Sequence, residues 1–93
     1  MVVGVVTWRM QLPAAGSLKE KRSVVKGVKA RLRNTLNVSV AETGLHDLPM
    51  SAQISACVVA TDQVQAQSVL QAADDLMEEE WRIRLSGTET VYY

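Results

Sequence analysis

The chain has 93 residues, of which 47% are hydrophobic and 22% charged, and its ten Lys and Arg residues balance ten Asp and Glu residues. This is the size of one domain, near the lower limit at which a protein buries an adequate core without disulfides or metal. One cysteine excludes an internal disulfide, and the apolar run over residues 1–6 is too short to span a bilayer. We therefore expect a single domain over residues 1–93, a cytoplasmic location and no membrane contact.

The zero net charge hides a difference between the two halves of the chain. Residues 1–46 carry eight Lys and Arg against two acids, a charge of +6, whereas residues 47–93 carry two Arg against eight acids, a charge of −6. The sequence therefore predicts a charge dipole with a local basic face, and not a uniformly basic surface.

The first half predicts a strand followed by a helix. Residues 2–12 are rich in valine and alternate in polarity, which is typical of a half-buried strand whose even-numbered residues face the core. Residues 13–16 end this strand, and Ser17 with Glu20 has the spacing of a helix capping box. We place a helix over residues 17–36, and Gly27 in its middle favours the close approach of a neighbour. The core face of this helix holds Leu18, Val25, Val28, Leu32 and Leu36.

The second half predicts two strands, a helix and a last strand. Residues 37–43 and 50–61 alternate as strands do, and residues 44–49 form a polar connection between them. Asp62 can cap a helix that runs to about residue 81, with one apolar face and an acidic face opposite. Residues 83–93 form the last strand, with a bulge or bend expected at Gly87.

This order of elements predicts the fold. Strand, helix, strand, strand, helix, strand with right-handed crossovers gives an α+β protein, the ferredoxin-like βαββαβ sandwich. A four-stranded antiparallel sheet then carries both helices on one face. The first and third strands are central neighbours, and the other face of the sheet is left open.

The first predicted helix holds seven of the ten Lys and Arg residues. Five of them recur at steps of three and four and form one line, here named the basic stripe: Lys19, Arg22, Lys26, Lys29 and Arg33. The stripe can contact nucleic-acid phosphates, or it can pair with the acidic helix or remain a solvated flank. Cations at the N-terminal end favour a binding role, because they oppose the helix dipole. The predicted nucleic-acid or partner site is Lys19, Lys21, Arg22, Lys26, Lys29 and Arg33.

A second candidate surface is the open face of the sheet. Antiparallel pairing of the central strands brings the start of the first strand beside the end of the third, and the C-terminal residues approach the same end. An apolar patch rimmed by polar residues indicates a covering partner, most simply a second copy of the chain. Neither central strand has an outward aromatic residue, so base stacking of the RNA-recognition-motif kind is not expected. The predicted oligomer interface is Val3, Val5, Cys57, Val59, Tyr92 and Tyr93.

Catalysis has weak support in the sequence. Glu42, His46 and Asp47 lie within one short segment, but no nucleophile motif accompanies them, and a lone histidine does not build a metal site. Cys57 lies by parity on the open face and has no feature of a reactive thiol. We expect no enzyme activity, no catalytic residue, no cofactor and no metal.

Three segments of the chain resemble a known family. The S-L-K-E-K-R run at residues 17–22, the N-V-S-V-A-E strand and the H-D pair before an alternating strand are similar to the small bacterial YlxP-like family, also catalogued as domain of unknown function 503. The likeness covers almost the whole chain, and it implies a ferredoxin-like fold. It also implies a role near ribosome maturation or translation, because the gene often lies beside those for translation initiation factor two and ribosome-binding factor A.

Together, the residues and the resemblance give two expectations. The first is a non-enzymatic protein that contacts ribosomal RNA or a ribosome-associated protein through its first helix. The alternative is a homo-oligomeric module, most simply a dimer, that uses the open sheet face and has no nucleic-acid contact.

Overall fold

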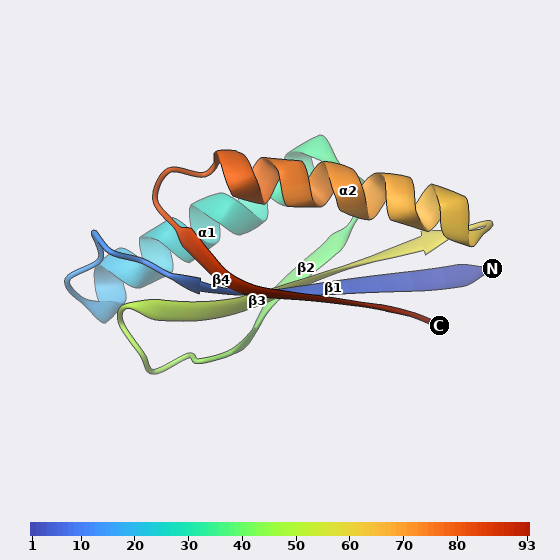
Figure 1. The fold of residues 1–93 in the computed structure, drawn as a ribbon. Coiled ribbons are helices and arrows are strands. Elements are labelled where there is room, and N and C mark those ends of the chain that lie inside the picture. Colours follow the sequence, from blue (N-terminus) through green and yellow to red (C-terminus); the bar gives the residue numbers. More distant parts are fainter.

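The computed structural model describes residues 1–93, and its six elements follow the predicted order. They form a sheet of order β2-β3-β1-β4 in which all neighbours are antiparallel. Both helices cover one face of this sheet (Figure 1), so the predicted α+β ferredoxin-like sandwich is confirmed. The elements are β1 (Val2–Gln11), α1 (Leu18–Thr35), β2 (Ser39–Gly44), β3 (Ser51–Ala60), α2 (Gln63–Glu79) and β4 (Arg84–Tyr92).

Side-chain caps begin both helices. Ser17 Oγ accepts the backbone N–H of Glu20 at 3.2 Å, and the Glu20 carboxylate accepts the backbone N–H of Gly16 at 3.0 Å. The carboxylate therefore reaches one residue before the cap, a small departure from the predicted capping box. Asp62 Oδ1 accepts the backbone N–H of Gln65 at 2.9 Å. Each such cap contributes about 1 kcal/mol to helix stability.

One continuous core of 17 buried apolar residues lies between the sheet and the helices. Its largest member, Trp8, is fully buried on central strand β1, as its even position predicts. The indole N–H of Trp8 donates to Asp74 Oδ1 at 2.8 Å. Asp74 therefore satisfies a buried donor, in addition to belonging to the acidic side of α2.

A bulge changes the side on which the residues of β4 face. Arg9 of β1 pairs with Gly87 whereas Met10 pairs with Leu85, so Ser86 is the extra residue, beside the position where a bulge was predicted. After the bulge Tyr92 pairs with buried Gly4 and faces the helices; a Cβ on Gly4 would lie 3.2 Å from its ring. The prediction that Tyr92 lies on the open face is therefore wrong, because the bulge shifts the alternation by one residue.

The molecule is elongated, with extents of 42 × 20 × 17 Å. Strands β2 and β4 form the two edges of the sheet, and each has one side without a neighbouring strand. No helix combines the length and apolarity needed to cross a bilayer.

Candidate functional site

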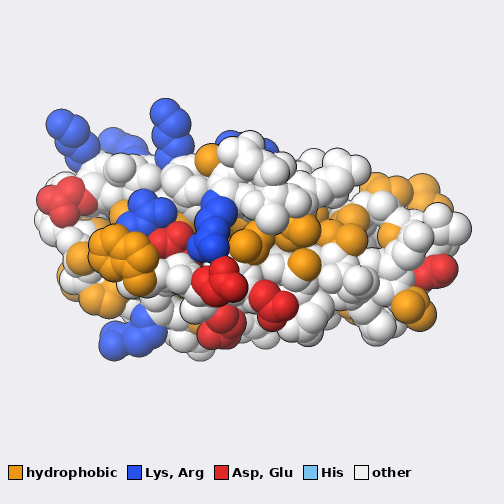
Figure 2. Space-filling view, turned by 90° about the horizontal axis from the view of Figure 1, so that it is seen from above, with side chains coloured by type: hydrophobic (Ala, Val, Ile, Leu, Met, Phe, Trp, Pro, Cys, Tyr) orange, Lys and Arg blue, Asp and Glu red, His pale blue; other side chains and the backbone are white.

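The basic stripe lies on the outer flank of α1. Lys29 is half-buried and the other four members of the stripe are exposed. None of the five lies within ion-pair distance of an acid, since the cations that form ion pairs are Lys21, Arg31 and Arg82. From residue 19 to residue 33 the stripe is about 21 Å long, at 1.5 Å of rise per residue. Figure 2 shows blue side chains gathered along one edge of the molecule, over α1.

The stripe faces away from α2. Arg31 is the cation of α1 that contacts α2, with Nη2 at 2.8 Å from Glu79 Oε2 and Nη1 at 3.8 Å from Glu80 Oε2. Lys29 and Arg33 are each two residues from Arg31, which places them about 160° around the helix from it. The interpretation that the stripe pairs with the acidic helix is therefore wrong. The stripe lies on the side of α1 toward β2, whereas Glu79 of α2 pairs with Arg31 on the other side of α1.

Lys21 is not part of any exposed surface. Its side chain is 1% exposed, and Nζ donates to the carbonyl oxygens of Leu45 at 2.5 Å and His46 at 3.2 Å. Nζ also lies 3.2 Å from Glu42 Oε2, an ion pair in which that oxygen makes no well-aligned hydrogen bond. We call this arrangement the Lys21 clamp. The prediction that Lys21 contacts a partner is wrong, because its ammonium group is used inside the fold.

The spacing of the first helix held a signal for this burial. Lys21 follows Leu18 by three residues and precedes Val25 by four, so it lies on the core face of α1 and not on the basic stripe. A lysine at such a position must find buried acceptors, because an unpaired buried charge is strongly destabilising. The clamp supplies them from the end of β2 and from the connection that follows.

The clamp holds the β2–β3 connection against the first turns of α1. Leu45 has a φ of 60°, a left-handed conformation that a branched residue keeps only when its surroundings fix it. His46 Nε2 lies 3.2 Å from the carbonyl oxygen of Glu42, and the His46 and Asp47 side chains are exposed. Apolar side chains of the same connection also reach solvent: Leu45, Leu48 and Met50.

The candidate acid–base residues do not form a reaction site. Glu42 is engaged by Lys21, and no cavity of the molecule is lined by Glu42, His46 or Asp47. No group of three His, Cys, Asp or Glu residues comes together in a way that could hold a metal ion. Cys57 is free and half-buried on the open face.

A second buried ionic group joins the end of α2 to α1. The Glu80 side chain is 6% exposed, and its Oε1 accepts from Arg82 Nε at 2.7 Å. This hydrogen bond lowers the pKa of Glu80 from its ordinary value and raises the pKa of Arg82, against the effect of burial. A Cβ on Gly27 would lie 3.1 Å from Arg82 Nη2, so the predicted close approach at Gly27 is confirmed and the neighbour is this guanidinium.

The open face of the sheet carries the predicted apolar patch, in which one of the predicted residues is replaced by another. Val3 pairs with Val59 and Val5 pairs with Cys57, as the antiparallel register predicts. Val59 is 65% exposed and Tyr93 is 76% exposed, whereas Val3, Val5 and Cys57 are half-buried. Val91, opposite Val5 on β4, joins the patch in place of Tyr92. At the polar end of the face three hydroxyl groups are hydrogen-bonded in a row. Ser55 Oγ lies 2.8 Å from Thr7 Oγ1 and 2.7 Å from Thr43 Oγ1.

The fold and these surfaces define a small ferredoxin-like protein with a basic flank that forms no ion pair with the acids of the chain. A family model described as "Protein of unknown function (DUF503)" matches residues 3–90, and the chain belongs to this family. The uncharacterized protein YlxP of Bacillus subtilis (strain 168) is 40% identical over 57 residues. These residues are 61% of this chain and 62% of the relative, so the match spans less than two thirds of the relative's length. The resemblance seen in the sequence is therefore confirmed.

One solved structure has a similar fold over most of both chains. It is a variant of SnoaB, described as a cofactor-independent oxygenase from Streptomyces nogalater, with a TM-score of 0.47 and 20% sequence identity. The match covers 99% of this chain and 90% of that chain.

Proposed function

We propose that this protein is a non-enzymatic RNA-binding protein that acts in ribosome maturation or translation, with the basic stripe as its contact surface. The observation that carries the proposal is a line of five cations, about 21 Å long, without an acidic partner. Cations arranged along such a line replace the counterions condensed on a nucleic-acid backbone, which makes binding favourable and dependent on salt. The link to the ribosome rests on what the YlxP-like resemblance implies.

The position of the stripe supports a ligand outside the chain. Three other cations, Lys21, Arg31 and Arg82, form ion pairs with acids of the same chain, so acids are available where a cation serves stability. Lys19 and Arg22 lie in the first turns of α1, where the helix dipole disfavours positive charge. The energetics of the helix therefore do not explain why cations stand at these two positions, whereas contact with an anionic partner explains them.

The contact is expected to follow the phosphates and not the bases. The open sheet face has no aromatic residue on its two central strands, and the stripe itself contains only Lys and Arg. Phosphate contacts fix the position of a protein on RNA without reading its sequence. We infer that shape and backbone geometry of a structured RNA, as in ribosomal RNA, determine where the protein binds.

A charge-reversal experiment with a matched control tests the proposal. The double variant Arg22→Glu/Lys26→Glu is compared with Arg9→Glu/Arg84→Glu, which changes the net charge equally at exposed cations outside α1. The first variant is expected to lose co-sedimentation with ribosomal particles at low salt, and the second to retain it. Circular dichroism checks that both remain folded. Equal binding by the two variants would remove the stripe from the proposal.

A second candidate function is homodimerisation through the open face. The observation that favours it is the exposure of Val59, Val91 and Tyr93 around half-buried Val3 and Val5. Light scattering of the purified protein is expected to give the mass of a dimer, and Val59→Glu to give the mass of a monomer. A monomer at high concentration of the unmodified protein would end this candidate.

A further inference from the structure

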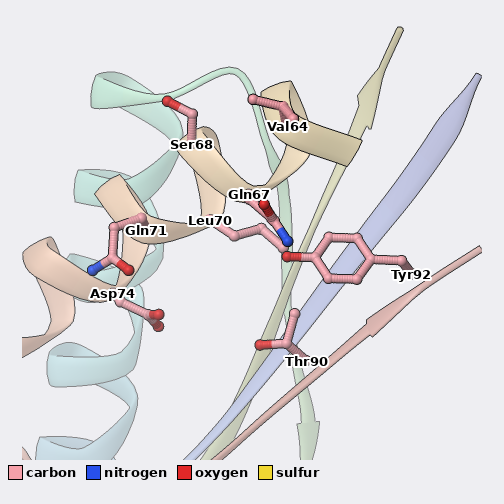
Figure 3. Close-up of a pocket in the computed structure, with 8 residues that line it drawn as sticks. All are labelled: Val64, Gln67, Ser68, Leu70, Gln71, Asp74, Thr90 and Tyr92. Atoms are coloured by element: carbon pink, nitrogen blue, oxygen red, sulfur yellow. The ribbon is translucent and has the colours of Figure 1, made fainter. Parts of the chain in front are cut away.

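The largest cavity is a groove between α2 and edge strand β4, on the edge of the molecule away from the basic stripe. Its volume is about 530 Å³. Figure 3 shows Gln67, Gln71 and Asp74 of α2 on one side and Thr90 and Tyr92 of β4 on the other, with Leu70 between them. The groove exists because neither helix covers the middle of the inner side of β4, where Thr88 and Thr90 are exposed between Leu85 and Tyr92, which pack against the core. It is therefore a groove of mixed polar and apolar lining beside a strand that has no outer neighbour.

The backbone of β4 has unpaired groups beside this groove. Val3 and Tyr93 exchange two backbone hydrogen bonds, N–H to O at 3.0 and 2.8 Å. In an antiparallel ladder the hydrogen-bonded pairs recur at every second residue, so the N–H and C=O groups of Tyr92, Thr90 and Thr88 point to the free edge. These are also the residues whose side chains face the helices. An added strand would bond to this edge and send alternate side chains into the groove.

Acidic residues without counterions lie along the α2 side of the groove, and one of them, Asp74, lines it. Asp74, Asp75 and Glu78 lie on or beside the flank of α2 that borders the groove, and none of them is in an ion pair. Helix α2 contains no Lys or Arg. Figure 2 shows red side chains on this side of the molecule, across from the blue edge over α1. A strand with basic side chains at alternate positions matches both the free backbone groups and the charge.

We infer that the groove and the free edge of β4 form a docking site for an extended basic segment of another protein, which adds to the sheet as a fifth strand. A second copy of this chain does not fit. Seven of its ten basic residues lie in helix α1, and pairing of two β4 edges would bring two acidic α2 flanks together. The inference does not rest on the proposed RNA contact, which uses the opposite edge of the molecule.

A designed peptide tests the inference directly. The probe is a nine-residue peptide with Lys at alternate positions and Thr or Val between them, added to the ¹⁵N-labelled full chain. The amides of Thr88, Thr90 and Tyr92 are expected to shift and to exchange with solvent at least 10-fold more slowly. A peptide with Glu in place of every Lys is expected not to bind. If these three amides are protected from exchange without peptide, and the protection increases with protein concentration, two β4 edges pair with each other. This result would overturn the inference.

Two changes separate strand addition from attraction to an acidic surface. Thr90→Pro removes one edge N–H without removing a bond to β1, and it is expected to weaken peptide binding at least 10-fold. A peptide methylated on the backbone nitrogens that face β4 leaves the protein unaltered and is expected to bind as weakly. Asp75→Asn/Glu78→Gln should also weaken binding, whereas Arg22→Glu/Lys26→Glu should not. Full binding of the methylated peptide, or of a folded Thr90→Pro variant, would overturn the inference.

Discussion

The two sides of helix α1 place the same kind of residue in opposite surroundings. On the inner side Lys21 is 1% exposed and its ammonium contacts two carbonyl oxygens and a carboxylate. On the outer flank the basic stripe has no acidic partner. The inner cations hold elements together, and the outer ones are free to bind an anion. The difference shows that burial and pairing, and not the number of charges on a helix, decide the role of each cation.

The largest effect is expected from breaking the Lys21 clamp. Lys21→Met keeps most of the buried volume but leaves Glu42 with an uncompensated charge and removes the donor to two carbonyl oxygens. We expect a loss of about 3–5 kcal/mol in the free energy of unfolding, measured by urea denaturation. Lys19→Met, on the exposed flank two residues away, is the control and should change this free energy by less than about 0.5 kcal/mol. Similar values for the two variants would refute the division of α1 into two sides.

A smaller effect is expected at the other buried ionic group. Glu80→Gln weakens the contact with Arg82, and at pH 7 we expect a loss of about 1–3 kcal/mol in the free energy of unfolding. Folding lowers the pKa of Glu80 below 4.5, so its contribution is fully present above that pH. As the pH falls from about 4.5 through the lowered value, the contribution disappears. The difference between the unmodified protein and Glu80→Gln, measured by urea denaturation, should therefore shrink between pH 7 and pH 3; a constant difference would contradict this assignment.

The smallest effect on stability, with a clear effect on binding, is expected on the outer flank. Lys26→Ala removes an exposed cation that contacts no acid, and the free energy of unfolding should change by less than about 0.5 kcal/mol. The logarithm of the RNA affinity should fall less steeply with the logarithm of the salt concentration, by about 0.7 to 0.9 for each phosphate contact that is lost. Fluorescence anisotropy at several salt concentrations measures this slope. A slope unchanged by Lys26→Ala would exclude Lys26 from the contact.

The fold was predictable because each element has a local signal. Ser17 and Asp62 cap the helices, the even positions of β1 are apolar, and Gly87 marks the bulge. The unpaired state of the stripe was not predictable, because helical spacing alone does not say toward which neighbour a flank is turned. The prediction for Tyr92 was wrong because the extra residue Ser86 reverses the face of the sheet on which every later residue of β4 lies. The groove could not be predicted from the sequence, because it depends on how α2 lies across the sheet. This position leaves the middle of edge strand β4 uncovered.

The sheet order has a consequence for how the chain folds during synthesis. Strand β1 is made first, but its two neighbours are β3, which begins 40 residues after the end of β1, and β4, which ends at Tyr92. Trp8 and the other even residues of β1 therefore lack one of their two sheet neighbours until β4 has left the ribosome. Contacts so distant in sequence form late, and exposed strand edges favour association with other chains in the meantime. A ribosome that stalls before residue 84 releases a nascent chain whose most buried strand still lacks one of its two partners.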